Sequence, residues 1–222
     1  KRGELLNHPP MGYVRGADRD YHLDPDEQAQ RVVRLIFDAF EQQGSLHGLL
    51  RYLVAHHIRL PIRPHKGANR GQLEWHRPNR MTLQNALHHP IYAGAYRWGY
   101  RKMDPRKQQP GRPHTGKTVN APEACEVFIK DRFPAYISWG RFESIQQRLA
   151  NNRSVAEAQG APREGPSLLG GLLRCGRCGR RLAPAYSGKA NHLRYLCMRA
   201  TIDYGAPVCL SFSGAVLDEF VT

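Results

Sequence analysis

The chain has 222 residues, which is enough for one well-packed domain and a small second one. Lys and Arg total 33 against 19 Asp and Glu, so the formal net charge is +14. This excess argues against an ordinary metabolic enzyme and favours a polyanionic partner, while no apolar run, secretory leader or basic amphipathic helix indicates a membrane.

The N-terminal part begins with residues 1–8, which we expect to be the end of an upstream element because Pro9 and Pro10 break it. A short strand is expected over residues 11–14, before a turn.

Apolar residues at helical spacing then predict three helices, over residues 25–43, 45–57 and 79–89. Asp24 lies where the first helix needs an N-cap, and Glu27 completes a capping box. Gly44 is placed to end this helix, Ser45 to cap the second, and Pro90 to end the third.

This order of helices, with a polar loop over residues 59–79, is typical of a helix-turn-helix-like unit, whose last helix enters the DNA major groove. Arg side chains pair with guanine there, and Asn and Gln with adenine. The candidate base-contacting residues are Arg77, Asn79, Arg80, Thr82, Gln84 and Asn85. The alternative is an amphipathic helix whose polar face only meets water.

A strand is predicted over residues 91–98, with residues 126–130 as its partner. Between them the chain is basic and contains prolines, which predicts an irregular loop that could follow phosphates or enter a minor groove. The candidate phosphate contacts are Arg101, Lys102, Arg106 and Lys107. The alternative is a surface loop without a partner. A fourth helix should start at Ser138, and residues 151–167 are expected to be a linker.

Four cysteines follow the linker, at Cys175, Cys178, Cys197 and Cys209. Two cysteines separated by two residues can direct both sulfurs at one metal, and two more complete the tetrahedron that structural zinc prefers. Four cysteines leave no position open for water or substrate, so we expect structural Zn²⁺. The alternative is two disulfides, which would require an oxidising compartment.

The cysteine module is itself basic, with arginines on both sides of the first cysteine pair. These could form a phosphate-contacting surface, or a solvated surface that serves solubility. The residues are Arg174, Arg177, Arg180 and Arg181. The predicted fold class is α+β: a mainly helical, helix-turn-helix-like domain with a small sheet over residues 9–150, and a small zinc β-ribbon over residues 168–222.

The order of several motifs resembles that of the large serine recombinases, the integrases and transposases of mobile elements. The matching residues are Pro9-Pro10-x-Gly12-Tyr13, Leu23-x-Pro25-x-Glu27, Gly44-Ser45, Trp75, Leu87-x-x-Pro90-x-Tyr92-x-Gly94, Ala135-Tyr136-Ile137-Ser138 and Leu169-x-Gly171-x-Leu173-x-Cys175-Gly-x-Cys178-Gly179. The similarity covers nearly the whole chain, as a recombinase domain (residues 9–150) and a recombinase zinc β-ribbon.

This resemblance implies DNA binding and site-specific recombination by a serine nucleophile. That serine would belong to a catalytic domain outside this chain, so whether the chain is itself an enzyme stays open. Residues 1–8 would end the linking helix, and Arg2 would lie near the DNA backbone. Double-stranded DNA is the implied partner, with self-association in the full-length protein. The implied setting is the cytoplasm of a bacterium, at the nucleoid, with a bacterial or phage origin.

Three other functions stay open. The first is a zinc-ribbon, helix-turn-helix transcription regulator. The second is a metal nuclease of the His-Asn-His type, for which Asn191-His192 is the one indication. The third is a zinc module that joins protomers.

Overall fold

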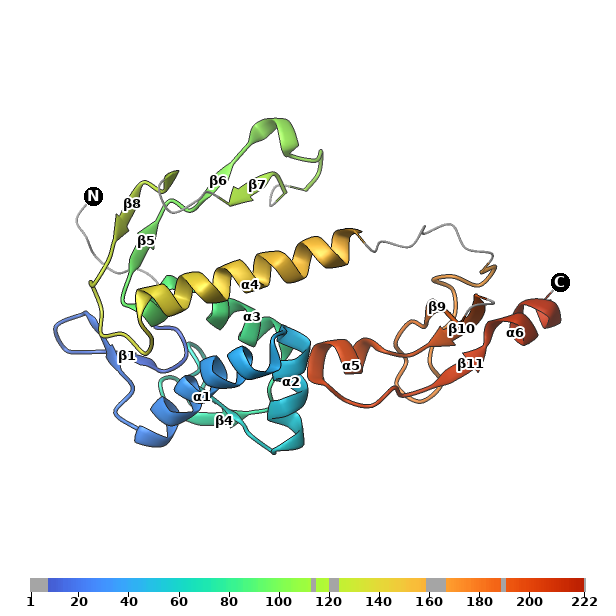
Figure 1. Ribbon diagram of the computed structural model, residues 1–222, viewed down its shortest axis with the longest axis horizontal. Coiled ribbons are helices and arrows are strands. Elements are labelled where there is room, and N and C mark those ends of the chain that lie inside the picture. The colour runs from blue at the N-terminus through green and yellow to red at the C-terminus, as the bar shows by residue number, and fades with distance from the viewer. Residues whose placement is uncertain (1–7, 113–114, 120–123, 159–166, 189–190, 222) are drawn as a thin grey trace. The chain divides into compact units, whose positions relative to one another are not determined.

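The computed structural model describes residues 8–112, 115–119, 124–158, 167–188 and 191–221 (Figure 1). Its helices are α1 (Glu27–Gln43), α2 (Leu46–Ala55), α3 (Arg80–His88), α4 (Trp139–Ala158), α5 (Arg199–Tyr204) and α6 (Gly214–Val221), with the 3₁₀ helices η1 (Pro90–Ala93) and η2 (Pro105–Lys107). Its strands are β1 (Tyr13–Arg15), β2 (Tyr21–Leu23), β3 (Leu60–Ile62), β4 (Glu74–His76), β5 (Tyr96–Trp98), β6 (Arg101–Met103), β7 (Lys117–Val119), β8 (Val127–Ile129), β9 (Ala183–Ser187), β10 (His192–Leu196) and β11 (Ser211–Ser213). This mixture of helices and small sheets confirms the predicted α+β class. Among the described helices, none is long and apolar enough to cross a membrane.

The described residues form two compact units that alternate along the chain. The first contains the described residues up to 37, residues 61–74 and the described residues of 85–147. The second contains residues 38–60, 75–84 and the described residues from 148 onward. Because the units alternate, the division of the chain into domains at 9–150 and 168–222 stays a prediction.

Three buried tyrosines form the centre of the first unit. The ring of Tyr13 packs against those of Tyr92 and Tyr136, with centroids 5.7 and 5.3 Å apart. The Tyr13 hydroxyl donates a hydrogen bond to the carbonyl oxygen of Ile91 at 2.8 Å. The Tyr136 hydroxyl donates to the carbonyl oxygen of Gly12. Burial raises the pKa of all three phenols, that of Tyr136 to about 12, so they stay neutral and can donate. The β1 segment is thereby fixed to η1 and to the start of α4.

The start of α1 differs from the prediction. The helix begins at Glu27, and its N-cap is Asp26, whose carboxylate accepts from the Ala29 N–H at 2.8 Å. Asp24, the expected cap, is instead buried and binds the Arg63 guanidinium through two hydrogen bonds of 2.7 and 2.8 Å. The prediction was wrong because the partner of Asp24 lies 39 residues away, where local patterns give no sign of it.

The caps of the next two helices agree with the prediction. Gly44 takes a positive φ of 70° directly after α1, and Ser45 caps α2 by accepting from the Gly48 N–H at 3.1 Å. At the start of α3, the Asn79 side chain accepts from the Thr82 N–H at 2.9 Å. The three predicted helices are therefore confirmed.

Two stretches expected to be irregular contain paired strands. β3 and β4 form a two-stranded sheet at the ends of the expected loop 59–79. In the basic segment, β6 and β7 form an antiparallel hairpin with Lys102 opposite Thr118. Prolines did not prevent this, because Pro105 lies in η2 at the tip and outside both strands.

The strand predicted over residues 91–98 is correct in its second half. Its first half is the 3₁₀ helix η1, which Pro90 starts and which the His89 side chain caps by accepting from the Ile91 N–H. β5 then pairs antiparallel with β8, with Tyr96 opposite Ile129, as expected.

The helix predicted from Ser138 is α4, which continues to Ala158. The first part of the range predicted as a linker is therefore helical, because its Ala- and Glu-containing sequence supports helix formation without an apolar face.

The C-terminal part contains a three-stranded antiparallel sheet in the order β11-β10-β9, with α6 packed against β10. Its fully enclosed residues are Cys175, Leu182, Tyr195 and Cys197. The Tyr195 hydroxyl donates to Asp218 of α6 at 2.8 Å. Two of these four buried residues are cysteines, so a metal ion held by them would add to the stability of a small apolar core.

Candidate nucleic-acid interface and metal centre

The four predicted metal ligands lie together. The first pair lies in the turn before β9, Cys197 follows β10, and Cys209 precedes β11. Their four sulfur atoms all lie within 4.8 Å of one another, with Cys175 and Cys209 at 3.7 Å and Cys178 and Cys197 at 3.4 Å. A tetrahedron with metal–sulfur bonds of about 2.3 Å has edges of about 3.8 Å. The arrangement can therefore hold a metal ion, and the cysteines form no disulfide.

The turn between the first two cysteines supports a thiolate. Burial raises the pKa of Cys175, but hydrogen bonds from the backbone N–H groups of Cys178 and Arg177 outweigh this and bring it to about 7. Gly179, with a φ of 70°, closes the turn by donating to the Cys175 carbonyl at 2.8 Å. Backbone amides directed at a sulfur are what a bound thiolate needs.

The α3 helix presents a solvent-exposed face from its first turn. Arg80, Met81 and Asn85 are exposed, whereas Thr82 and Gln84 are half-buried. The three exposed side chains can therefore contact a partner outside the chain, and the two half-buried ones can do so only in part. His88, at the end of the same helix, is also exposed and bonds through Nδ1 to Gln146 Oε1 at 2.8 Å.

Two of the predicted base-contacting residues make contacts within the protein. The Asn79 side chain is the N-cap of α3, which uses its carbonyl oxygen. The Arg77 guanidinium lies over the Tyr204 ring at 5.1 Å and donates to the Tyr204 carbonyl at 3.3 Å. Arg2 lies outside the described residues.

The β6–β7 hairpin is a basic element of the first unit that extends beyond β5 and β8 (Figure 1). Both Arg101 and Lys102 of β6 are exposed, as are Arg106 and Lys107 in η2. The hairpin continues outward from β5 and β8, and Tyr100 at its base packs beneath the Arg101 guanidinium at 5.1 Å. All four predicted phosphate contacts therefore lie on one projecting, positively charged hairpin.

The four arginines beside the cysteine turn are all exposed. Arg177 donates to the Cys209 carbonyl at 3.0 Å, and Arg174 donates to the Gly179 carbonyl at 3.3 Å. These two guanidinium groups brace the cysteine turn. Arg180 contributes through its backbone, since its carbonyl accepts from the Cys175 N–H at 2.7 Å, and the described hydrogen bonds show no such role for the guanidinium of Arg180 or Arg181.

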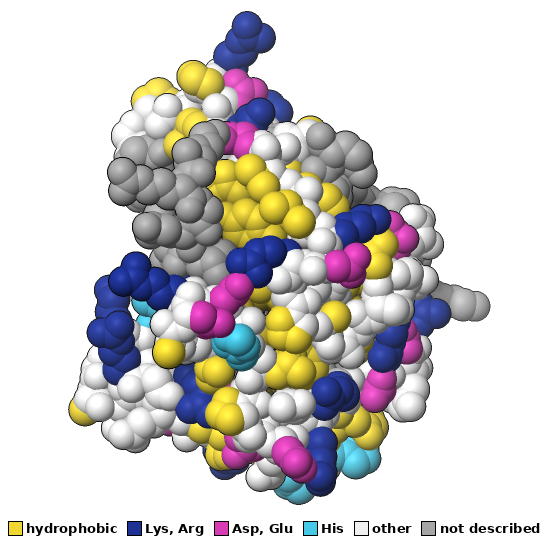
Figure 2. All heavy atoms as spheres, turned by 90° about the vertical axis from the view of Figure 1, so that its left-hand side faces the viewer, with side chains coloured by type: hydrophobic (Ala, Val, Ile, Leu, Met, Phe, Trp, Pro, Cys, Tyr) yellow, Lys and Arg dark blue, Asp and Glu magenta, His cyan; other side chains and the backbone are white. Residues whose placement is uncertain are grey.

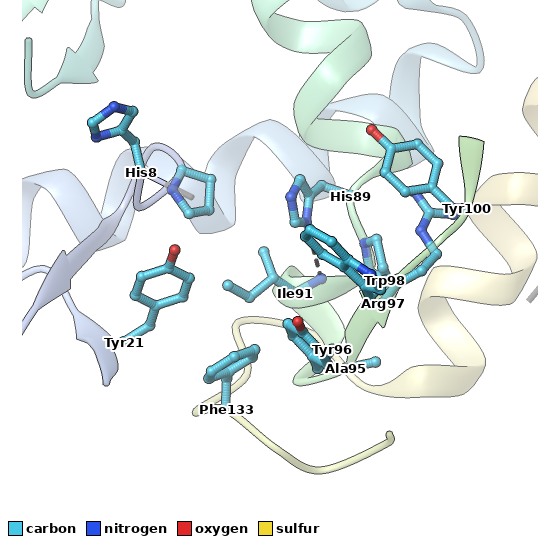
Figure 3. A pocket seen from close by; sticks show the side chains of 12 residues that line it. His8, Tyr21, His89, Ile91, Ala95, Tyr96, Arg97, Trp98, Tyr100 and Phe133 are labelled. Carbon is cyan, nitrogen blue, oxygen red and sulfur yellow. Dashed lines mark hydrogen bonds between the residues drawn. The ribbon is translucent and has the colours of Figure 1, made fainter. Parts of the chain in front are cut away.

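The first unit contains a cavity of about 110 Å³, lined largely by aromatic rings (Figure 3). His89 and Arg97 contribute its basic groups, and burial of the imidazole together with the Arg97 charge lowers the pKa of His89 to about 4. The described residues that line the cavity include no carboxylate, cysteine or serine.

Figure 2 shows one face of the molecule, with apolar side chains gathered near its middle. Lys and Arg are interspersed with Asp and Glu over the rest of this face. The positive charge of the chain is thus not concentrated into one continuous patch on this side.

One feature of α3 was missed from the sequence. Met81 was not among the candidates, yet its side chain is 64% exposed between Arg80 and Thr82. Helical spacing alone could have indicated it, since Met81 and Asn85 are four residues apart and share a face.

Two family models match this chain. Residues 27–152 match the family described as Recombinase, and residues 168–222 match the Recombinase zinc beta ribbon domain. The uncharacterized protein y4bA/y4pH of Sinorhizobium fredii (strain NBRC 101917 / NGR234) is 35% identical over 228 residues, covering 100% of this chain and 32% of that protein. The chain thus spans about a third of the length of this curated relative.

Two solved structures are similar along the whole chain. One carries the description "Sequence Requirements of the Listeria innocua prophage attP site", with 16% identity, a TM-score of 0.40 and 76% of that chain covered. The other is described as "Crystal Structure of a LSR-DNA Complex", with 18% identity, a TM-score of 0.39 and 57% of that chain covered.

Proposed function

Because the chain belongs to the Recombinase family and carries the recombinase zinc beta ribbon domain, we propose that it is the DNA-binding portion of a site-specific large serine recombinase. It recognises attachment-site DNA as a duplex, and strand exchange is performed by a serine-containing catalytic domain of the full-length protein. This chain has no catalytic role of its own in the proposal.

The observation that carries the proposal is the exposed face of α3. The helix follows α1 and α2, and its first six residues present Arg80, Met81 and Asn85 to solvent. Arg and Asn are the side chains that bind guanine and adenine edges in the major groove.

The β6–β7 hairpin supplies the sequence-independent contacts. Arg101, Lys102, Arg106 and Lys107 are all exposed, and η2 brings the last two to the hairpin tip. Phosphate contacts of this kind give affinity and fix orientation without reading sequence. Arg180 and Arg181 of the ribbon provide a second set, and Arg2 a third.

The metal is Zn²⁺ in a structural role. Four thiolates are a donor set that zinc fills completely, so no position is left for water or substrate. Cys175, Cys178, Cys197 and Cys209 would hold the ion and join the turn before β9 to the ends of β10 and β11. The ion would supply folding stability to the ribbon.

The test is selection of bound sequences from a random duplex pool, followed by titration of the enriched duplex at several salt concentrations. We expect an enriched motif and an affinity that falls steeply with salt, with a slope of about −0.9 per phosphate neutralised. Recovery of unchanged random sequence together with a flat salt response would refute the proposal.

A further inference from the structure

Met81 is the exposed apolar side chain at the second position of α3, with 64% of its surface accessible. Its neighbours on the solvent side of the helix are polar or charged. An exposed methionine is unremarkable alone. Met81, however, lies at the start of the helix that carries the proposed DNA contacts. The N-terminal residues of such a helix meet base edges, so Met81 is a candidate for a base contact.

The contacts of the surrounding residues narrow the choice of base-reading side chains. Asn79 is occupied as the N-cap, and Arg77 binds Tyr204. Thr82 is half-buried, and its backbone N–H serves the cap. The exposed side chains of the first turn and a half are therefore Arg80, Met81 and Asn85.

We propose that Met81 is a specificity-determining residue that packs on the 5-methyl group of a thymine in the major groove. This inference rests on the proposed function. The thymine methyl is the apolar group that the major groove presents among the standard bases, and a flexible thioether adapts to such a surface.

The helix geometry also places the thymine relative to the base read by Asn85. Four residues of α-helix rise about 6 Å, which is close to two base-pair steps of about 3.4 Å. The contacts of Met81 and Asn85 therefore fall about two base pairs apart along the site. The selected site should contain a thymine near an adenine at that spacing.

The experiment removes the methyl group without changing any hydrogen bond. Each thymine of the selected duplex is replaced in turn by deoxyuridine, and affinities are measured for the wild-type chain and for Met81→Ala. One replacement should weaken wild-type binding about fourfold, the equivalent of about 0.8 kcal/mol for one methyl-sized group. Met81→Ala should bind that duplex and its thymine parent equally.

Val216→Ala is the matched control, because Val216 is 65% exposed in α6 and has no assigned contact with DNA. It should keep the wild-type thymine preference. Both substitutions are at exposed sites, so equal thermal unfolding of the variants shows that folding is unchanged. If the wild type binds its site but no thymine replacement matters, or if Met81→Ala keeps the preference, the inference is wrong. If the wild type selects no site at all, the proposed function fails as well.

Discussion

Removal of the metal is the perturbation whose effect can be worked out most fully. Apart from the two buried cysteines, the fully buried residues of the ribbon core are Leu182 and Tyr195. Burying one large side chain contributes about 1.5–3 kcal/mol, so these two give about 3–6 kcal/mol. A structural zinc contributes about 10–16 kcal/mol at neutral pH. A bound ion would therefore contribute more than these two side chains do, and we expect the described part of 168–221 to unfold without it.

The assay is amide hydrogen exchange before and after chelation, with the zinc content measured in parallel. Amides of β9, β10 and β11 should lose protection, while those of β1 and the tyrosine-centred first unit keep it. Cys197→Ser should reproduce the chelated pattern, whereas Cys125→Ser, at a cysteine outside the cluster, should retain metal and protection. Unchanged protection of the ribbon strands in metal-free protein would refute the reasoning.

Two further predictions concern stability and DNA contacts. Arg63→Met should lower the free energy of unfolding at pH 7 by about 3 kcal/mol because it leaves the buried Asp24 carboxylate unpaired, whereas Arg31→Met, which breaks an exposed pair, should change it by less than about 0.5 kcal/mol. Burial raises the pKa of Asp24, but the bonds from Arg63 bring it below its ordinary value, so the pair stabilises the fold above about pH 4 and this contribution is lost as the pH falls further. Urea unfolding should show that the difference in the free energy of unfolding between wild type and Arg63→Met is smaller at pH 3 than at pH 7. A difference that stays constant would count against the Asp24–Arg63 pairing. In binding titrations, Asn85→Ala should cost about 1–3 kcal/mol at one base position and relax preference there, while Lys102→Ala should weaken all duplexes alike and reduce the salt slope by about 1; identical losses on random DNA for both would remove the base-reading role of α3.

Features encoded by adjacent residues could be predicted from the sequence. Gly44 and Ser45 separate α1 from α2 through positive φ and a side-chain cap, both of which act within three residues. The Cys175–Cys178 spacing likewise fixes a turn that directs two sulfurs one way, and the structure brings Cys197 and Cys209 to it. The resemblance to the large serine recombinases, which depended on such motifs, is confirmed by the two family matches.

Features set by distant partners could not be predicted. Asp24 has the sequence of an N-cap, but Asp26 caps α1 while Asp24 pairs with Arg63 in the segment after β3. The β3–β4 pair was missed because three-residue strands carry too little alternation to be recognised.

The candidate site shows the same division. The types of residue on α3 could be read from the sequence. Which of their side chains are free to contact DNA, and which are bound within the protein, could not. The cap at Asn79 and the contact of Arg77 with Tyr204 appear only in the fold, as does the exposure of Met81.

The affinity ratio between the selected duplex and a shuffled duplex of the same composition tests the central claim most directly. It should be measured by fluorescence anisotropy at physiological salt with zinc-loaded protein. If α3 contacts bases while the basic hairpin contacts phosphates, the selected duplex should bind at least about a thousandfold more tightly than the shuffled duplex. A ratio near one would mean that the chain binds charge alone, and would contradict the account.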